Sequence, residues 1–164
     1  MKLADLNALE PVAFTDALGA IFEHSAWVAV AVTDQRPFSS LTALHTAMCQ
    51  AMRAASRDQQ LELINAHPEL AARISMTADS VAEQRGAGLD RLTPDEHAAL
   101  LELNRAYRAR FGFPFILAVK GKDKNDIRAA LEARIAHDLE TEFQTALAEI
   151  EKIARFRLET LISG

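Results

Sequence analysis

Residues 138–162 read DLETEFQTALAEIEKIARFRLETLI, and this stretch decides the fold class. Its apolar residues recur at spacings of three and four, which is the period of one face of an α-helix. Ala, Leu, Glu and Arg dominate the whole chain while Tyr and Trp occur once each, and this composition also favours helix. The stretch predicts a long C-terminal helix whose buried stripe consists of Phe143, Leu147, Ile150, Ala154, Leu158 and Leu161.

Working towards the N-terminus, residues that favour helix starts recur along the chain. Proline suits the first position of a helix, and serine or threonine suits the capping position before it. Thr93-Pro94-Asp95-Glu96 combines both signals with the spacing of a capping box, which predicts a helix to about residue 110. The other predicted starts lie at or next to Pro11, Ser25, Ser40, Ser56, Ser80, Asn125 and Asp138.

Residues 111–119, FGFPFILAV, are predicted to be extended because they are rich in Phe, Ile and Val and contain Gly112 and Pro114. No second convincing strand pattern exists to pair with them in a sheet. We therefore predict an all-α fold, a single compact domain over residues 1–164 with about seven to nine helices.

The charge balance restricts the possible partners. The 164 residues carry 18 Lys and Arg against 23 Asp and Glu, a net charge of −5, with no long basic run, so a nucleic-acid partner is not expected. The longest apolar stretch, 26–32, is too short for a membrane span. A lone Cys49 and the lack of a signal-peptide pattern favour a cytoplasmic protein.

Arg157 interrupts the apolar stripe of the last helix. A guanidinium keeps its proton, so a buried one needs an acid or an anionic ligand. Arg157 is therefore a candidate ligand-binding residue. The alternative is that it lies at the edge of the stripe and reaches water, or pairs with a carboxylate of the protein itself.

His67-Pro68-Glu69 is the second unusual feature. Pro68 disfavours helical geometry at His67, so the imidazole is expected to project from a helix end. There it could reach into a cleft and exchange protons near neutral pH. The alternative is a histidine that interacts with the dipole at a helix C-terminus.

Ser80, Glu83 and Gln84 would share one face of a short helix, since they are three and four residues apart. A hydroxyl, a carboxylate and an amide would then converge on one wall of a ligand site. Ser80 and Glu83 also have the spacing of a capping box, which remains an equally good explanation.

The fourth candidate is the aromatic run at residues 111–116. A non-helical segment leaves backbone N–H and C=O groups that could bind a ligand rich in amides. The alternative is a loop whose Phe side chains simply fill the core. No zinc motif, phosphate loop or dinucleotide motif occurs, so the sequence indicates a site without metal or cofactor.

Taken together, these features resemble the 2-oxo-4-hydroxy-4-carboxy-5-ureidoimidazoline (OHCU) decarboxylase family. The order and spacing of the motifs carry the resemblance over nearly the whole chain. The matching elements are Trp27, Arg36-Pro37-Phe38, His67-Pro68, Ser80-x-x-Glu83-Gln84, Gly88-Leu89, Leu103-Asn104-x-x-Tyr107, Phe111-Gly112-Phe113-Pro114-Phe115 and Ile153-Ala154-x-x-Arg157-Leu158.

The resemblance implies an enzyme of uric acid degradation that forms (S)-allantoin, needs neither metal nor organic cofactor, and is a homodimer. The family's catalytic residues fall on His67 and Glu83. The small-molecule substrate, OHCU, would be bound by Pro68, Ser80, Gln84, the backbone from Phe115 to Val119, and Arg157. The alternative to an enzyme is a helical module that binds a small anion without turnover.

Overall fold

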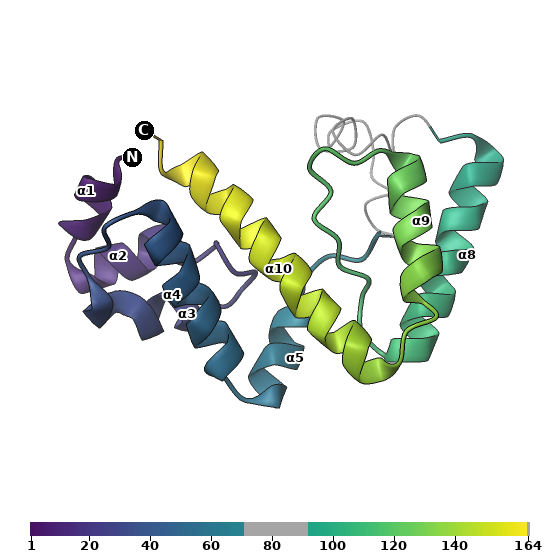
Figure 1. Cartoon of the computed structure of the whole chain (residues 1–164), viewed down its shortest axis with the longest axis horizontal. Helices are drawn as coiled ribbons and strands as arrows, with labels where there is room; N and C mark the ends of the chain where they lie inside the picture. The colour runs from purple at the N-terminus through teal and green to yellow at the C-terminus, as the bar shows by residue number, and fades with distance from the viewer. Residues whose placement is uncertain (71–91, 164) are drawn as a thin grey trace. The chain divides into compact units, whose positions relative to one another are not determined.

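The computed structural model describes residues 1–70 and 92–163. These residues contain eight α-helices and one 3-10 helix, and no strand occurs among them (Figure 1). The predicted all-α fold is confirmed. Within the described ranges, no helix combines the length and the apolar character that crossing a bilayer requires.

The chain forms two compact units. Unit 1 consists of Met1–Ala66 and Ile150–Gly164, and unit 2 of His67–Glu149. The last helix, α10 (Leu139–Leu161), contributes its first half to unit 2 and its second half to unit 1. Each unit has its own buried residues.

Unit 1 is built from short helices that precede a longer one. Its core contains Phe14, Met48 and Leu158, all fully buried. α3 packs against both α2 and α4 (Figure 1). The helices are α1 (Leu3–Asn7), α2 (Pro11–Leu18), α3 (Trp27–Val32), the 3-10 helix η1 (Thr33–Gln35), α4 (Leu41–Ala54) and α5 (Arg57–Ala66).

Two of the three predicted serine caps in unit 1 are confirmed. Ser40 Oγ accepts from the backbone N–H of Ala43 at 3.0 Å, and Ser56 Oγ accepts from that of Gln59 at 3.2 Å. Ser25 was the wrong choice for α3. Its hydroxyl donates to the carbonyl of Glu23 at 2.8 Å, and the capping position belongs to Ala26, which offers no side-chain cap.

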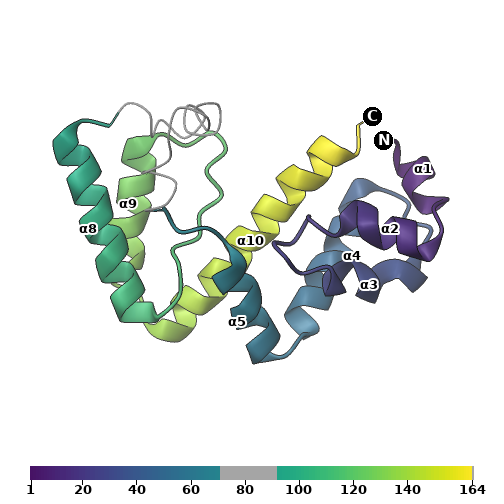
Figure 2. The same cartoon turned by 180° about the vertical axis from the view of Figure 1, so that it is seen from behind.

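Unit 2 contains α8 (Pro94–Phe111), α9 (Lys124–Arg134) and the start of α10. Thr93 and Glu96 form the predicted capping box, with Pro94 in the first helical position. α8 ends at Gly112, whose φ of 76° lies in the left-handed region that glycine adopts at no steric cost. α8 and α9 lie side by side in both Figure 1 and Figure 2.

Residues 112–119 connect α8 to the loop before α9 without helix or strand geometry. This segment runs beside α9 in both views of the chain (Figures 1 and 2). Its side chains at 113–116 and at 118 are buried, so the segment is part of the core of unit 2. The predicted non-helical character of this run is confirmed, and α8 simply extends one residue further, through Phe111.

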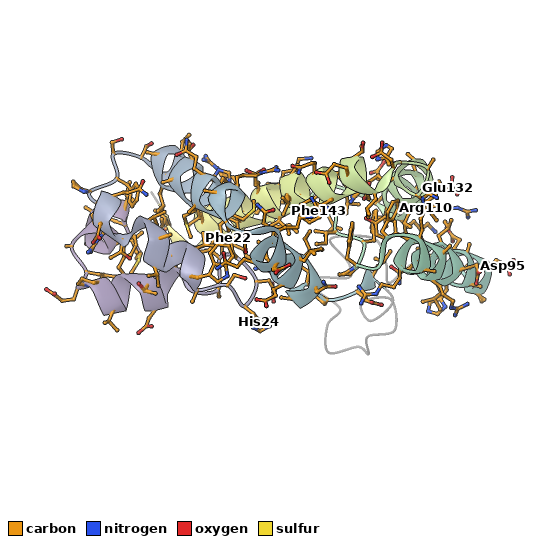
Figure 3. The ribbon with its side chains drawn as sticks, turned by 90° about the horizontal axis from the view of Figure 1, so that it is seen from below. Phe22, His24, Asp95, Arg110, Glu132 and Phe143 are labelled. Atoms are coloured by element: carbon orange, nitrogen blue, oxygen red, sulfur yellow. The ribbon has the colours of Figure 1, made fainter. Side chains whose placement is uncertain are left out.

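The predicted stripe on α10 is buried from Phe143 through Leu158. Leu161 is only half-buried, and Ile162 takes the buried place at the end of the helix. In Figure 3, Phe143 lies among neighbouring side chains, whereas Asp95, at the start of α8, points outwards.

Candidate functional site

His67 directly follows the last residue of α5, in a bend, as Pro68 predicted. Its side chain is buried, with 7% of the residue exposed, while Pro68 is exposed. Glu69 continues the segment and pairs with Arg108 of α8, with 3.3 Å between Oε1 and Nε. The segment that follows the buried histidine is therefore attached to α8.

A small cavity in unit 2 brings three of the predicted binding residues together. Pro68, Phe115 and Val119 line it, and its volume is about 20 Å³. A space of that size holds roughly one water molecule. The remaining lining residues are apolar: Leu70, Leu117 and Ile127.

Three further predicted residues, Ser80, Glu83 and Gln84, lie outside the described residues. The predicted helix from Ser80 to Arg85 lies there as well. The role of Glu83 in catalysis, and those of Ser80 and Gln84 in binding, stay predictions.

Behind the cavity-lining segment lies a buried polar cluster that the sequence reading missed. Tyr107 Oη donates to Glu142 at 2.5 Å, and Arg134 Nε donates to the same carboxylate oxygen at 2.7 Å. His137 Nδ1 lies 3.1 Å from the other oxygen of Glu142. Burial, and then the hydrogen bond to Glu142 and its negative charge, raise the pKa of Tyr107 far above its usual value. The tyrosine therefore stays a neutral donor.

This cluster reaches the backbone of the segment through Arg134. Its Nη1 donates to the carbonyl of Ile116 at 2.6 Å, and its guanidinium lies 4.4 Å from the centre of the Phe115 ring. A second buried acid, Glu149, accepts from the backbone N–H of Ala118 at 3.2 Å. A sequence signal existed, because Glu142 and Glu149 are seven residues apart and flank the apolar stripe of α10.

Arg157 belongs to unit 1, where it already has partners. Its Nη2 lies 2.5 Å from Glu23 Oε2, and Nη1 donates to the carbonyls of Ala20 and Ile21 at 3.0 and 3.3 Å. The side chain is 36% exposed. Pairing with a carboxylate of the protein was the alternative weighed against ligand binding, and this pairing is present. Because the side chain is also partly exposed, binding to substrate stays a prediction.

Cys49 and His45 of unit 1 lie close together but do not form a nucleophile and base suited to catalysis. Burial, and then the charge of Glu151, raise the pKa of the Cys49 thiol to about 12, so it is a poor nucleophile at neutral pH. His45 Nε2 lies 2.7 Å from the carbonyl of Glu151 and 3.3 Å from Cys49 Sγ. Among the described residues, no three His, Cys, Asp or Glu side chains gather as metal ligands would.

Comparison with known proteins shows which family this chain belongs to. The sequence model of the OHCU decarboxylase family matches residues 7–159. The chain belongs to this family. The family match takes in most of both units.

Two relatives of this OHCU decarboxylase family member are similar over nearly all of it. One is the "2-oxo-4-hydroxy-4-carboxy-5-ureidoimidazoline decarboxylase" of Haloferax volcanii, 47% identical over 164 residues that cover 100% of this chain and 98% of that one. The other is the "Uric acid degradation bifunctional protein PucL" of Bacillus subtilis, 53% identical over 97% of this chain. This chain spans 32% of the length of PucL.

Solved structures are similar as well. The crystal structure of (S)-allantoin synthase superposes with a TM-score of 0.83 at 36% identity, covering 99% of this chain and 54% of that one. The crystal structure of an OHCU decarboxylase in the presence of (S)-allantoin gives a TM-score of 0.72 at 25% identity, covering 90% and 99%.

Proposed function

We infer that this chain decarboxylates OHCU to (S)-allantoin in the degradation of uric acid. The observation that carries this function is its 47% identity, over its whole length, to a protein named OHCU decarboxylase. A solved structure of the same fold was obtained in the presence of (S)-allantoin. The helical binding module without turnover is the less well supported alternative.

The substrate's own chemistry removes the need for a cofactor in our proposal. One ring carbon of OHCU carries both a carboxylate and a hydroxyl, and it is adjacent to a C=N bond. When the bond to CO₂ breaks, its electron pair forms a C=C bond and the imine pair moves to nitrogen, which takes a proton. The resulting enol becomes the carbonyl of allantoin by gaining a proton on the neighbouring carbon and losing the hydroxyl proton. The protein then has to orient the ring and move protons.

We assign the proton transfers to His67 and Glu83. His67 supports this role by its position, because it is a buried imidazole that directly precedes Pro68, one of the cavity-lining residues. An imidazole is suited to exchanging protons near neutral pH. Burial also excludes water, which strengthens every electrostatic interaction with a bound ligand.

We assign substrate binding to Pro68, Ser80, Gln84, the backbone from Phe115 to Val119, and Arg157. The segment at 115–119 supports its assignment because it lines a cavity with Pro68. A planar guanidinium such as that of Arg157 suits carboxylate or carbonyl oxygens. We further propose that the protein acts in the cytoplasm as a homodimer, and that residues 1–164 form one functional domain.

The deciding experiment supplies freshly generated OHCU in excess over the protein and follows the release of CO₂. An enzyme consumes many equivalents of substrate, whereas a binding module takes up one equivalent and stops. Including a strong chelator tests the proposal that no metal is needed. Release of CO₂ at the spontaneous rate would remove the proposed function, and loss of turnover with chelator would remove the metal-free mechanism.

The stereochemistry of the product tests the proton transfers. The enol is planar, so solvent protonates either face and gives both enantiomers of allantoin. A pocket that presents one acid to one face should give (S)-allantoin at early times, and in heavy water the new C–H position should carry deuterium. Racemic product at the earliest times, together with accelerated CO₂ release, would mean that the enol leaves the protein before it is protonated.

A further inference from the structure

The segment at 115–119 alternates between two kinds of residue. Phe115, Leu117 and Val119 line the cavity with Pro68. Ile116 and Ala118, which lie between them, carry the backbone groups that buried charged side chains bind. A period of two is typical of extended backbone, in which neighbouring residues present their N–H and C=O groups to opposite sides.

One side of the segment is therefore fixed by two long side chains from separate helices. Arg134, at the end of α9, donates to the Ile116 carbonyl, and Glu149, from α10, accepts from the Ala118 N–H. Both residues are almost completely buried, with 6% and 5% exposed. Hydrogen bonds to ionised groups are about twice as strong as neutral ones, which suits a segment that has no helix or sheet to hold it.

The guanidinium of Arg134 is fixed in turn. Glu142, fully buried, binds it through Nε, and Tyr107 donates to the same carboxylate. The five N–H donors of arginine form a rigid fork, so an arginine held at one edge presents its other edge in a fixed direction. That other edge carries Nη1, which binds the Ile116 carbonyl.

The opposite side of the segment has no hydrogen-bond partner among the described residues. Within the described residues, the backbone N–H and C=O groups of Phe115 and Leu117 make no hydrogen bond. Phe115 is buried and Leu117 is half-buried, and unpaired backbone groups at such places are uncommon. An amide-bearing substrate would pair with them.

We propose that Arg134 and Glu149 are positioning residues. They hold the backbone of residues 115–119 in one orientation, so that the backbone of Phe115 and Leu117 faces the substrate. This inference rests on the proposed function, because it names the groups that hold the binding backbone in place. Neither side chain touches the substrate. Their effect is on how well the backbone of Phe115 and Leu117 is oriented before the substrate arrives.

The first test compares two substitutions of Glu149 that both remove its charge. Glu149→Gln keeps an oxygen that accepts from Ala118, whereas Glu149→Met keeps the length and loses the acceptor. Glu149→Met should raise KM for OHCU about tenfold, the usual scale for losing a hydrogen bond to a charged group, with a smaller change in kcat. Glu149→Gln should stay within about threefold of wild type. Equal KM values in the two variants would overturn the role of Glu149.

The second test concerns Arg134. Arg134→Lys keeps a cation for Glu142 but loses the second nitrogen arm, so it should raise KM about tenfold while the fold is retained. Arg128→Lys is the matched control, since Arg128 is also an arginine of α9 that pairs with a glutamate, but its pair with Glu132, at 2.8 Å, is about half exposed. That control should leave both the melting temperature and KM nearly unchanged. An Arg134 variant with wild-type KM, or a control with the same rise in KM, would overturn the proposal.

Amide hydrogen exchange tests the contact without using activity. The Ala118 N–H should exchange slowly in the wild type and in Glu149→Gln, and at least tenfold faster in Glu149→Met. Equal rates in all three would overturn the proposal even if the wild type decarboxylates OHCU. Conversely, a wild type in which the Ala118 N–H exchanges slowly but which fails to release CO₂ would count against the proposed function. The positioning role of Glu149 would then remain.

Discussion

Unit 1 and unit 2 differ in the kind of polar side chain that they bury. Among the described residues, the buried polar side chains of unit 1 are the neutral Ser25, Thr33 and Gln60. Unit 2 buries Arg134, Glu142 and Glu149, and also His67 and Asn104. Burying a charge costs several kcal/mol unless it is paired and hydrogen-bonded. Buried charges in a fold therefore call for a structural or functional explanation.

In unit 2, the non-helical segment at 112–119 explains the buried charges. The helices of unit 1 satisfy their own backbone groups, so neutral side chains are sufficient there. The non-helical segment of unit 2 has no helical hydrogen bonds of its own. Arg134 and Glu149 instead bind its Ile116 carbonyl and its Ala118 N–H. Buried charge therefore follows irregular backbone, and irregular backbone is where we propose that the substrate binds.

The largest expected effect tests this contrast on stability. Glu142→Gln leaves the buried guanidinium of Arg134 without its counter-charge, which should lower the free energy of unfolding by about 3–5 kcal/mol. Glu151→Gln is the matched control in unit 1. Its partner Arg53 lies at the same 2.5 Å, but the two side chains are 34% and 25% exposed, so the loss should be about 1 kcal/mol or less. Urea unfolding of both variants measures the difference, and equal losses would contradict the contrast.

The next effect concerns catalysis in unit 2. His67→Asn keeps a polar side chain but removes the proton-exchanging imidazole, so kcat should fall by roughly two orders of magnitude or more. Glu83→Gln should have an effect of the same size. His24→Asn is the control, because the His24 side chain is 79% exposed and points outwards in Figure 3. Near-wild-type turnover of the His67 variant, with folding checked by circular dichroism, would show that its proposed role is wrong.

The sequence predicted the helices better than the site, and the reason is physical. Periodicity and caps are local signals, so the stripe of α10, the Thr93 capping box and the Ser40 cap could all be read directly. Ser25 misled because a serine near a helix start can bond elsewhere, here to the carbonyl of Glu23. Local signals raised His67 and Glu83 as candidates, but only the family resemblance assigned them catalytic roles.

Spacing could mark Glu142 and Glu149 as acids beside the stripe of α10, but it could not reveal which groups these buried charges contact. Arg134 closes an ordinary helix end, where a basic residue is expected to interact with the helix dipole. Its contact with Ile116 joins residues 18 positions apart, and that of Glu149 with Ala118 joins residues 31 apart. Such contacts depend on how the helices pack, which the spacing of residues along one helix does not reveal.

A smaller effect is expected from Arg157, on the side of unit 1. Arg157→Lys keeps the charge and loses the planar fork, so kcat/KM should fall about tenfold, with both KM and kcat contributing. Arg53→Lys is the matched control, since Arg53 is also a half-exposed arginine that lies 2.5 Å from a glutamate. An Arg157 variant as active as wild type would leave the Glu23 pairing as its whole role and would confine the substrate contacts to unit 2.

The smallest effect comes from the one buried titratable thiol of the described part of unit 1. Burial and the charge of Glu151 raise the pKa of Cys49 from 9.0 to about 12, so the folded state holds the thiol proton more tightly than the unfolded chain does. Stability from this group is complete below pH 9 and is lost as the pH rises from about 9 towards 12, since only the unfolded chain releases the proton there. The loss should be about 0.4 kcal/mol at pH 9 and about 1.4 kcal/mol at pH 10.

Cys49→Ala lacks this dependence but shares every other titrating group with the wild type, Tyr107 included. The difference between the unfolding free energies of the two proteins therefore isolates the thiol. Urea unfolding at pH 7, 9 and 10 should show that difference changing in favour of the alanine variant. A constant difference across this range would mean that water reaches Cys49 in the folded state, and that unit 1 does not keep its buried groups neutral in the way its structure indicates.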